Sequence, residues 1–323
     1  MLKRACIVSG CVAVVIAWAA VVSSQTPLPN PTPREPSWAF QVIEGQLPPE
    51  SPEPKTVPGS TRKYTPKEID DLFNPPDWFP DQHPPAPAVI TKGRPGVMAC
   101  GSCHLMSGLG HPESADLTGF TAEYLIRQMH DFRSGARQDF ARRMDGFAKA
   151  MTDEEIRQAA EWFASLPRRR FVRVVEAAMV PKTFVGQGRM RFIDPKQTGM
   201  EPIGNRIITL PENQELARLR DPRSGFVAYV PPGSIARGRR LVEEGGGGRT
   251  IACTICHGDT LKGLGNVPRL AGNHPIYVVR QLIHFKEGTR KGVDAALMAK
   301  PVAKLTERDM IDIAAYLGSL SPE

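Results

Sequence analysis

A short cysteine–histidine motif that occurs twice constrains this 323-residue chain more than any other feature. Both copies, at residues 100–104 and 253–257, read Cys-x-x-Cys-His. This spacing is typical of covalent heme attachment, because two thiols add to the two vinyl groups of one porphyrin and the adjacent histidine ligates its iron. The sequence therefore predicts two covalently attached heme c groups. The residues predicted to hold them are Cys100, Cys103, His104, Cys253, Cys256 and His257.

Two other uses of paired cysteines explain less of this pattern. A four-cysteine zinc site would leave both following histidines unexplained, and a thioredoxin-like redox pair needs no histidine after each second cysteine. The remaining cysteines, Cys6 and Cys11, lie in the N-terminal apolar segment. No thiol is therefore left for a structural disulfide or a catalytic nucleophile.

The N-terminus has the layout of a secretory signal. Lys3 and Arg4 precede a weakly apolar run from Ala5 to Val22, and small residues close the run. We expect residues 1–24 to be a signal peptide cleaved near Gln25, and the mature protein to be periplasmic. The alternative is an uncleaved inner-membrane anchor, since about 18 apolar residues is at the short end for a membrane span.

The charge balance argues against one class of partner. The formal net charge is +7, which becomes +5 when the two basic residues of the signal are subtracted, and four heme propionates would offset most of the rest. No run of lysine or arginine has interleaved aromatic residues of the kind that nucleic-acid surfaces use. We therefore expect no nucleic-acid partner.

The two motifs open two copies of a longer repeat. Cys253 follows Cys100 by 153 residues, and the spacing becomes 154 near the end of each copy. A period this long indicates a duplicated domain rather than a solenoid. The positions that match include Tyr124 and Tyr277, Gln128 and Gln281, Phe132 and Phe285, Arg137 and Arg290, and Thr152 and Thr306.

Each copy has the periodicity of helices. The apolar residues of 124–132 and of 277–285 fall on one helical face, and Gly135 and Gly288 act as stops. Thr152 and Thr306 each precede an acidic residue by three positions, which predicts a capped helix start. The predicted fold class is therefore mainly α, with two tandem small helical bundles, each around one covalent heme.

A low-spin electron carrier needs a second axial ligand on each iron, and methionine opposite histidine raises the reduction potential. Met144 and Met298 each lie eight residues before a predicted helix start, in a loop between helices. Their matched positions make them the predicted distal ligands.

Other side chains in each copy are weaker candidates for this role. Met129 and Met310 lie on apolar helical faces, where packing is the ordinary use of methionine. His130 and His284 nearly match each other but lie within the long helices. Three further candidates have no equivalent in the second copy: Met106, Met151 and His111.

These motifs resemble class I cytochrome c domains, and their tandem arrangement is similar to the diheme cytochrome c4 type. The resemblance covers residues 95–167 and 233–321. It implies attachment through the cysteines and histidines above and distal ligation by Met144 and Met298. It also implies that the carbonyl of a proline accepts a hydrogen bond from the heme histidine. Pro268 occupies that position in the second copy, and Ala115 replaces it in the first.

The regions outside the two copies complete the predicted organisation. Residues 25–90 are a proline-rich tether with one short helix, and residues 91–168 and 233–323 are the two cytochrome domains. Residues 169–232 form a strap, which is long for a connector. The β-branched and aromatic runs Phe171–Val175 and Arg206–Leu210 predict short strands in the strap.

The first copy lacks the helix that precedes the motif in the second copy, at Ser234–Glu244. A cap at Thr65 followed by Pro66 predicts a replacement helix that continues to Phe73. We expect this helix to dock where the missing one would lie, and Trp78 and Phe79 to cover the edge of the first heme.

The functional expectation is a periplasmic diheme protein that is not an enzyme. It would transfer single electrons between a dehydrogenase or respiratory complex and a terminal acceptor. Its partners would therefore be redox proteins, free or membrane-bound, and not a small-molecule substrate. A tightly bound subunit of a larger oxidoreductase is the alternative. A diheme enzyme such as a peroxidase would need an accessible iron position or an unusual ligand such as cysteine.

Overall fold

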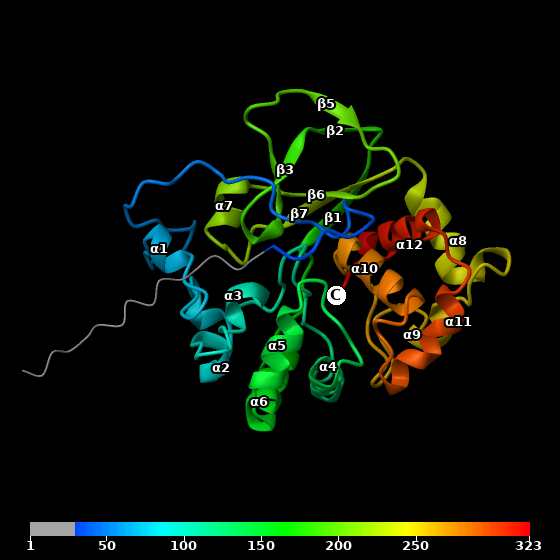
Figure 1. Cartoon of the computed structure of the whole chain (residues 1–323), viewed down its shortest axis with the longest axis horizontal. Helices are drawn as coiled ribbons and strands as arrows, with labels where there is room; N and C mark the ends of the chain where they lie inside the picture. Colours follow the sequence, from blue (N-terminus) through cyan, green and yellow to red (C-terminus); the bar gives the residue numbers. More distant parts are fainter. Residues whose placement is uncertain (1–29) are drawn as a thin grey trace, which may run out of the picture.

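The structure is a computed structural model that describes residues 30–323, so the expected signal segment, residues 1–24, lies outside the described part. Figure 1 shows two groups of helices side by side, a layer of short strands across one end of both, and the tether along one flank. Among residues 30–323, no helix is both long enough and apolar enough to cross a membrane. The prediction of a mainly α fold with two helical bundles is confirmed.

The two bundles share most of their helices, but the long helix before the heme motif is present only in the second. The first contains α3 (Gly101–His104), α4 (Ala122–Ser134), α5 (Arg143–Ala150) and α6 (Asp153–Ser165). The second contains α8 (Ser234–Glu244), η3 (Gly245–Gly247), α9 (Thr254–His257), α10 (Pro275–Lys286), η4 (Val293–Met298), α11 (Ala299–Val302) and α12 (Glu307–Ser319).

The strap supplies the strands. It contains β1 (Val172–Glu176), β2 (Met179–Pro181), β3 (Thr183–Val185), η2 (Gln187–Arg189), β4 (Arg191–Ile193), β5 (Met200–Pro202), β6 (Ile208–Pro211), α7 (Gln214–Arg218) and β7 (Phe226–Val230). The order β1-β7-β6 makes one sheet, with β1 parallel and β6 antiparallel to β7. The pairs β2–β5 and β3–β4 are antiparallel. Strands therefore form in both runs where the sequence predicts them.

The strap is packed rather than loose. Phe171, Ile207 and Phe226 belong to the same buried cluster as the helices of the second bundle, and so does Phe40 of the tether. The first bundle has a separate cluster. Because burial of apolar side chains is the main stabilising term in folding, the strap and the second bundle form one hydrophobic core.

Helix ends follow the local sequence. Thr152 and Thr306 are N-caps in complete capping boxes, each with an acidic partner three residues on. Gly135 ends α4 in the left-handed conformation, with φ of 80°, which glycine adopts without strain. The predicted starts of the last helix of each bundle are confirmed.

We predict that Glu155→Gln destabilises the protein in a pH-dependent way. Glu155 caps α6 and also accepts from Arg94, with 2.7 Å between Arg94 Nη2 and its Oε2. The hydrogen bond from Arg94 lowers the pKa of Glu155 to about 2. A lowered carboxyl pKa contributes stability above its unfolded value, about 4.3, and this contribution is lost as pH falls toward 2.

The wild type should therefore exceed the variant in free energy of unfolding by about 1 kcal/mol at neutral pH. Urea titrations should show this difference shrinking between pH 4.5 and 2. Glu161→Gln on the exposed face of α6 is the matched control and should show a smaller difference. A difference for Glu155→Gln that is independent of pH would contradict the prediction.

The first helix of the second bundle crosses the last one closely. Gly238 of α8 lies against α12, where an added Cβ would be 1.9 Å from the carbonyl oxygen of Asp312 and 2.9 Å from Cβ of Tyr316. Only glycine permits this approach.

The tether departs from its prediction. From residue 30 onward it contains three short helices, α1 (Pro66–Ile69), η1 (Pro80–Gln82) and α2 (Ala88–Thr91). The helix predicted to reach Phe73 ends at Ile69, and α2 is the helix that packs on α6 and α3. The predicted replacement helix was therefore the wrong segment, because a one-turn helix with a single buried residue has too little apolar surface to replace α8.

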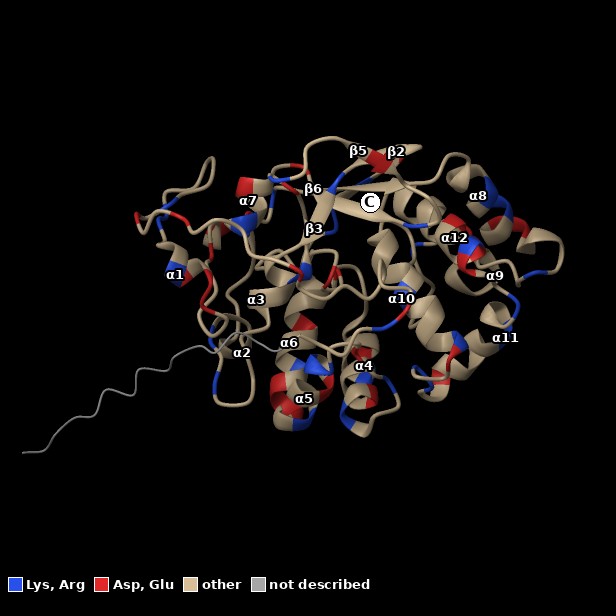
Figure 2. Ribbon diagram, turned by 45° about the horizontal axis from the view of Figure 1, so that its top comes forward, with Lys and Arg blue, Asp and Glu red and all other residues tan. Residues whose placement is uncertain are grey.

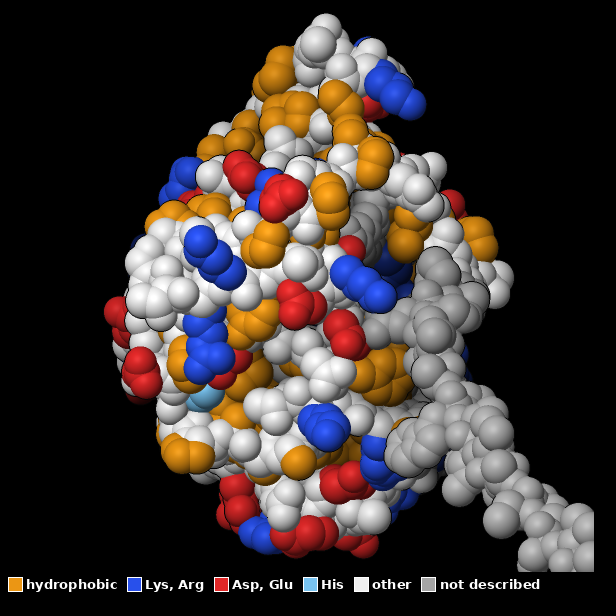
Figure 3. All heavy atoms as spheres, turned by 90° about the vertical axis from the view of Figure 1, so that its left-hand side faces the viewer, with side chains coloured by type: hydrophobic (Ala, Val, Ile, Leu, Met, Phe, Trp, Pro, Cys, Tyr) orange, Lys and Arg blue, Asp and Glu red, His pale blue; other side chains and the backbone are white. Residues whose placement is uncertain are grey.

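The aromatic residues of the tether also lie elsewhere than expected. Trp78 and Phe79 form a small cluster with Ile69 and with Leu219 of the strap, and Trp78 Nε1 donates to the Leu219 carbonyl at 2.8 Å. Neither lines the cavity beside the first heme motif, so the prediction that they cover it was wrong. Figure 3 shows this flank of the molecule, where apolar, basic and acidic side chains are mixed.

Candidate heme sites

The first heme motif lies on α3, with Cys100 as its N-cap. His104 is buried, and its Nδ1 is 2.8 Å from the carbonyl oxygen of Ala115. Burial lowers the pKa of His104, which favours a neutral ring at neutral pH. A neutral ring that donates from Nδ1 leaves the Nε2 lone pair free, which is the form that ligates iron.

The second heme motif repeats this geometry on α9. His257 is buried, with Nδ1 2.7 Å from the carbonyl oxygen of Pro268, and burial lowers its pKa too. The histidine–carbonyl hydrogen bond implied by the resemblance is thus present in both copies. Replacement of proline by Ala115 leaves it intact, because the acceptor is a backbone group.

The cysteines have the chemistry of attachment points rather than of nucleophiles. Burial raises the pKa of the Cys100 thiol to about 12 and that of the Cys253 thiol to about 11. A reactive cysteine needs a lowered pKa, because the thiolate is the nucleophile. Among residues 30–323, no group of histidine, cysteine, aspartate or glutamate side chains could hold a separate metal ion.

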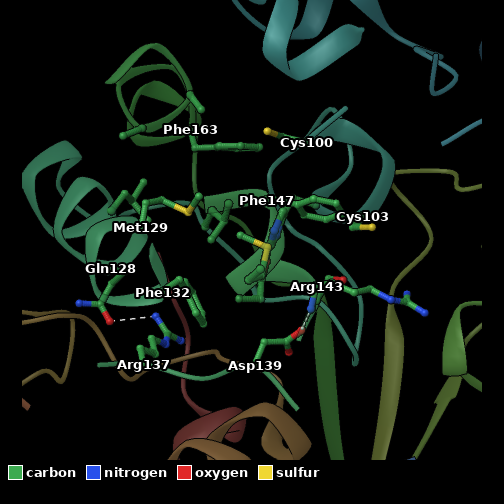
Figure 4. Close-up of a pocket in the computed structure, with 18 of the residues that line it drawn as sticks. Cys100, Cys103, Gln128, Met129, Phe132, Arg137, Asp139, Arg143, Phe147 and Phe163 are labelled. Atoms are coloured by element: carbon green, nitrogen blue, oxygen red, sulfur yellow. Dashed lines mark hydrogen bonds between the residues drawn. The ribbon is translucent and has the colours of Figure 1, made fainter. Parts of the chain in front are cut away.

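An apolar cavity lies beside the first motif, between α3, α4, α5 and α6 (Figure 4). Cys100 and Cys103 lie at one side, and Met129 and Phe147 point toward its middle. The aromatic residues Phe120, Phe132, Phe140 and Phe163 also line it. Such a cavity, with two thiols and a neutral histidine at its edge, suits an apolar macrocycle.

The structure places the predicted distal ligands in different surroundings. Met144 lies in α5 and Met298 in η4, so the expectation that both lie in a loop was wrong. Met144 lines the first cavity, as do Met129 and Met151. Met298 ends η4 and is partly buried against the core of the second bundle, whereas Met310 is fully in that core. Met144 and Met129 both line the cavity, so the geometry alone does not decide which of them is the distal ligand.

The histidines that the sequence left as alternatives also differ. His130 is half-exposed and pairs with Asp153, with 3.4 Å from Nε2 to Oδ1. His284 of α10 lines the first cavity from the second bundle, and its Nδ1 is 2.6 Å from Thr289 Oγ1. The near match of these two positions in sequence does not correspond to equivalent places in the structure.

A polar seam joins the two bundles through three pairs of equivalent residues. Tyr277 OH accepts from Arg137 at 3.0 Å, and Tyr124 OH accepts from Arg290 at 2.9 Å. Both guanidinium groups also donate to the two side-chain oxygens of Gln128 and Gln281. Since the repeat relates each pair, the duplicated residues meet about an approximate two-fold axis.

The sequence identifies these residues as repeat markers but does not predict that they contact one another. The signal was present: polar tyrosine, glutamine and arginine are kept at matched positions in both copies. Side chains kept on a helical face without apolar character indicate a polar contact rather than a core.

A buried ion pair forms a second link between the bundles. Asp116 Oδ2 is 2.5 Å from Arg269 Nη2, and both side chains are nearly inaccessible, at 4% and 0%. These positions are 153 apart and directly follow Ala115 and Pro268, whose carbonyls hold the heme histidines. The pair therefore connects the two loops that orient the histidines.

The two heme motifs differ in how far other segments of the chain bury them. Ser102 is buried: its hydroxyl donates to the Leu72 carbonyl of the tether at 2.5 Å, and its carbonyl accepts from Arg220 of the strap at 2.6 Å. The equivalent residue of the second motif, Ile255, is 70% exposed. Nearby residues of the second copy are also exposed, namely Leu264, Val293 and Leu297.

Comparison with known proteins agrees with this architecture. The cytochrome c family model matches residues 235–321. Cytochrome c4 of Pseudomonas aeruginosa is 26% identical over 232 residues, which cover 71% of this chain and 87% of the relative. A thiosulfate dehydrogenase electron acceptor of Thiomonas intermedia is 25% identical over 244 residues, covering 73% and 86%. Cytochrome c-554(548) of Halomonas halodenitrificans is 38% identical over 68 residues, covering 21% and 82%.

Two tandem bundles, each with a buried histidine in a Cys-x-x-Cys-His helix, define a diheme electron-transfer protein with covalently bound heme c. The chain belongs to the cytochrome c family, in its diheme cytochrome c4-like group. The resemblance inferred from the motifs is confirmed, and so are the heme cofactors.

Proposed function

We propose that this protein is a periplasmic carrier that passes single electrons between a donor and an acceptor redox protein. The observation that carries the proposal is the pair of buried histidines, each within hydrogen-bond distance of a backbone carbonyl in the same register of the repeat. One heme would be held by Cys100, Cys103, His104 and Met144. The other would be held by Cys253, Cys256, His257 and Met298.

The chain's residues would orient each heme and exclude water around it. The bound iron supplies the chemistry by alternating between Fe(II) and Fe(III). The Ala115 and Pro268 carbonyls fix the direction of each imidazole, so its lone pair stays aligned during the redox change. The apolar lining of the first cavity keeps solvent away and disfavours the more charged oxidised state.

The uneven cover of the two motifs supports an assignment of the partner surface. The tether and strap cover the first motif through Leu72 and Arg220, whereas Ile255 of the second motif is exposed. Electron transfer is fastest where a heme edge can approach a partner, so partners would exchange electrons at the second heme. Acidic and basic residues are interspersed over the molecule rather than gathered in one field (Figure 2).

A dehydrogenase is a suitable donor class. The relative from Thiomonas intermedia is described as an electron acceptor of thiosulfate dehydrogenase, and it matches over most of both chains. Its acceptor would be a further redox protein, free or at the membrane. No small-molecule substrate is needed in this reaction.

A tightly bound subunit of a larger oxidoreductase is the second candidate function. The observation that favours it is the antiparallel strand pair β2–β5 of the strap, where Met179 and Met200 are 44% and 53% exposed. Exposed methionines of this kind are used at protein contact surfaces. A stable partner that co-purifies with the wild type, and is lost from a Met179→Ser/Met200→Ser variant, would favour this candidate over a free carrier.

We predict that the heme-loaded protein has two closed, methionine-ligated irons. The oxidised visible spectrum should show a weak sulfur-to-iron band at the red end, lost on reduction, and carbon monoxide should not alter the reduced spectrum. The physical reason is that occupied axial positions leave no site for an added ligand. A carbon monoxide response from half of the heme would contradict the proposal and favour a diheme enzyme.

A further inference from the structure

Arg189 is a buried cation of the strap that lacks a partner. It ends η2, its residue is 6% exposed, and its backbone φ of 59° lies in the left-handed region that non-glycine residues rarely adopt. Its Nε and Nη1 atoms are buried without a hydrogen-bond acceptor. The side chain lines the first heme cavity, with its guanidinium carbon 5.8 Å from the centre of the Phe140 ring.

The other arginines around this cavity differ from Arg189. Arg137 donates to Tyr277, Gln128 and Gln281 in the polar seam. Arg280 pairs with Glu113 and donates to the Pro112 carbonyl.

The remaining ionisable side chains at the cavity do not supply the missing partner. Arg143 runs away from the middle of the cavity, and Asp139 accepts from the backbone N–H of Arg143 at 3.0 Å (Figure 4). Within residues 30–323, no carboxylate forms an ion pair with Arg189. Among the described arginines that line this cavity, Arg189 is therefore the one whose buried side-chain nitrogens lack an acceptor.

An unpaired guanidinium in a buried site is expensive, because its hydration is lost and nothing replaces it. A left-handed backbone at the same residue adds strain to the arrangement. Both features are accounted for if the cavity contains an anion when the protein is complete. A heme bound in this cavity would bring two propionates, which are themselves costly to bury without cations.

We propose that the guanidinium of Arg189 binds a propionate of the heme attached at Cys100 and Cys103. This inference rests on the proposed function, which places a heme in that cavity. Arginine suits the role because its planar fork donates two parallel hydrogen bonds to a carboxylate. The strap is then part of the first heme site and not only a connector between the bundles.

The repeat does not duplicate this contact. Arg189 lies in the strap, between the two copies of the repeat, so the repeat assigns it no equivalent residue in the second copy. The first heme therefore has a strap cation that the second has not. Since a nearby positive charge favours Fe(II) over Fe(III), Arg189 raises the potential of the first heme selectively.

The test is a spectroelectrochemical titration of the full-length, heme-loaded protein and its Arg189→Gln variant. One of the two reduction waves should move to lower potential by at least about 59 mV. For one electron, this shift is a tenfold change in the equilibrium constant of reduction. The other wave should stay in place. Arg191→Gln is the matched control, because Arg191 lies two residues away in the strap, donates to Thr183, and does not line the cavity.

A charge-conserving variant and a hydrogen-exchange measurement test the same contact in other ways. Arg189→Lys retains the charge and should keep both waves near their wild-type positions. This variant still tests the role of the charge if Arg189→Gln fails to fold. Hydrogen exchange over residues 187–193 should be faster in Arg189→Gln than in Arg191→Gln, because the strap loses its contact to the heme.

The outcomes separate this inference from the proposed function. Two hemes per chain with both waves unmoved in Arg189→Gln would overturn the contact with the propionate, and so would an equal shift in Arg191→Gln or a full shift in Arg189→Lys. A heme content below two per chain would overturn the proposed function instead.

Discussion

Replacement of Met144 by alanine is expected to lower the potential of one heme by a large part of the roughly 0.8 V range that axial ligation covers. Thioether sulfur stabilises Fe(II), so its loss favours the oxidised state. The same iron should then bind carbon monoxide, because its sixth position is accessible. Met298→Ala should have the same two effects on the other heme. Potentiometric titration and carbon monoxide difference spectra measure both.

Met129→Leu is the matched control for Met144→Ala. Met129 lines the same cavity as Met144 but lies on α4 and packs against the core of the first bundle. Met129→Leu should therefore leave both irons closed and both potentials nearly unchanged. If Met129→Leu opens an iron and Met144→Ala does not, the distal ligand of the first heme is Met129, and the argument from matched positions in the repeat is wrong for this copy.

The parts of the fold that sequence predicts here are those set by local rules. Covalent attachment needs its residues within five positions, so the motifs are complete in the sequence. Capping at Thr152 and Thr306 and the stop at Gly135 depend on the residue and its near neighbours. The strands at Val172–Glu176 and Ile208–Pro211 follow β-branched runs.

The parts that sequence misses depend on contacts between distant segments. Ser102 and Ile255 occupy equivalent places, yet the polar residue is buried and the apolar one exposed. Polarity alone predicts the reverse. The outcome depends on Leu72 and Arg220, which are 30 and 118 positions from Ser102 and which no local pattern links to it.

The choice of distal ligand likewise depends on contacts that the local sequence does not determine. Register in the repeat identifies Met144 and Met298 as equivalent, but register does not state which methionine reaches an iron. That choice depends on how α4 and α5 pack around the cavity, where Met129 and Met144 both reach the wall. Matched variants of the two residues therefore decide what sequence alone leaves as a prediction.

The second large effect is expected from Arg269→Met, which should lower the free energy of unfolding by about 3–5 kcal/mol. The variant removes the cation and leaves Asp116 buried at 4% exposure without its partner. Arg269 also donates to the Thr118 carbonyl of the first bundle and to the Ala271 carbonyl of the second. Loss of one side chain thus leaves acceptors in both bundles unsatisfied. Urea unfolding followed by circular dichroism measures the change.

The double variant Asp116→Leu/Arg269→Met separates the charge from the packing. Removing both charges leaves no uncompensated ion, so part of the loss should be recovered. The part that remains reports the Thr118 and Ala271 carbonyls left without a donor and the Thr118 donors left without Asp116. Arg157→Met on α6 is the exposed comparison: it breaks pairs with Glu154 and Glu161 and should change stability by less than about 1 kcal/mol. A loss for Arg269→Met as small as that of Arg157→Met would show that the Asp116–Arg269 pair does not hold the bundles together. The polar seam of tyrosines, glutamines and arginines would then be the main polar link between the two hemes' domains.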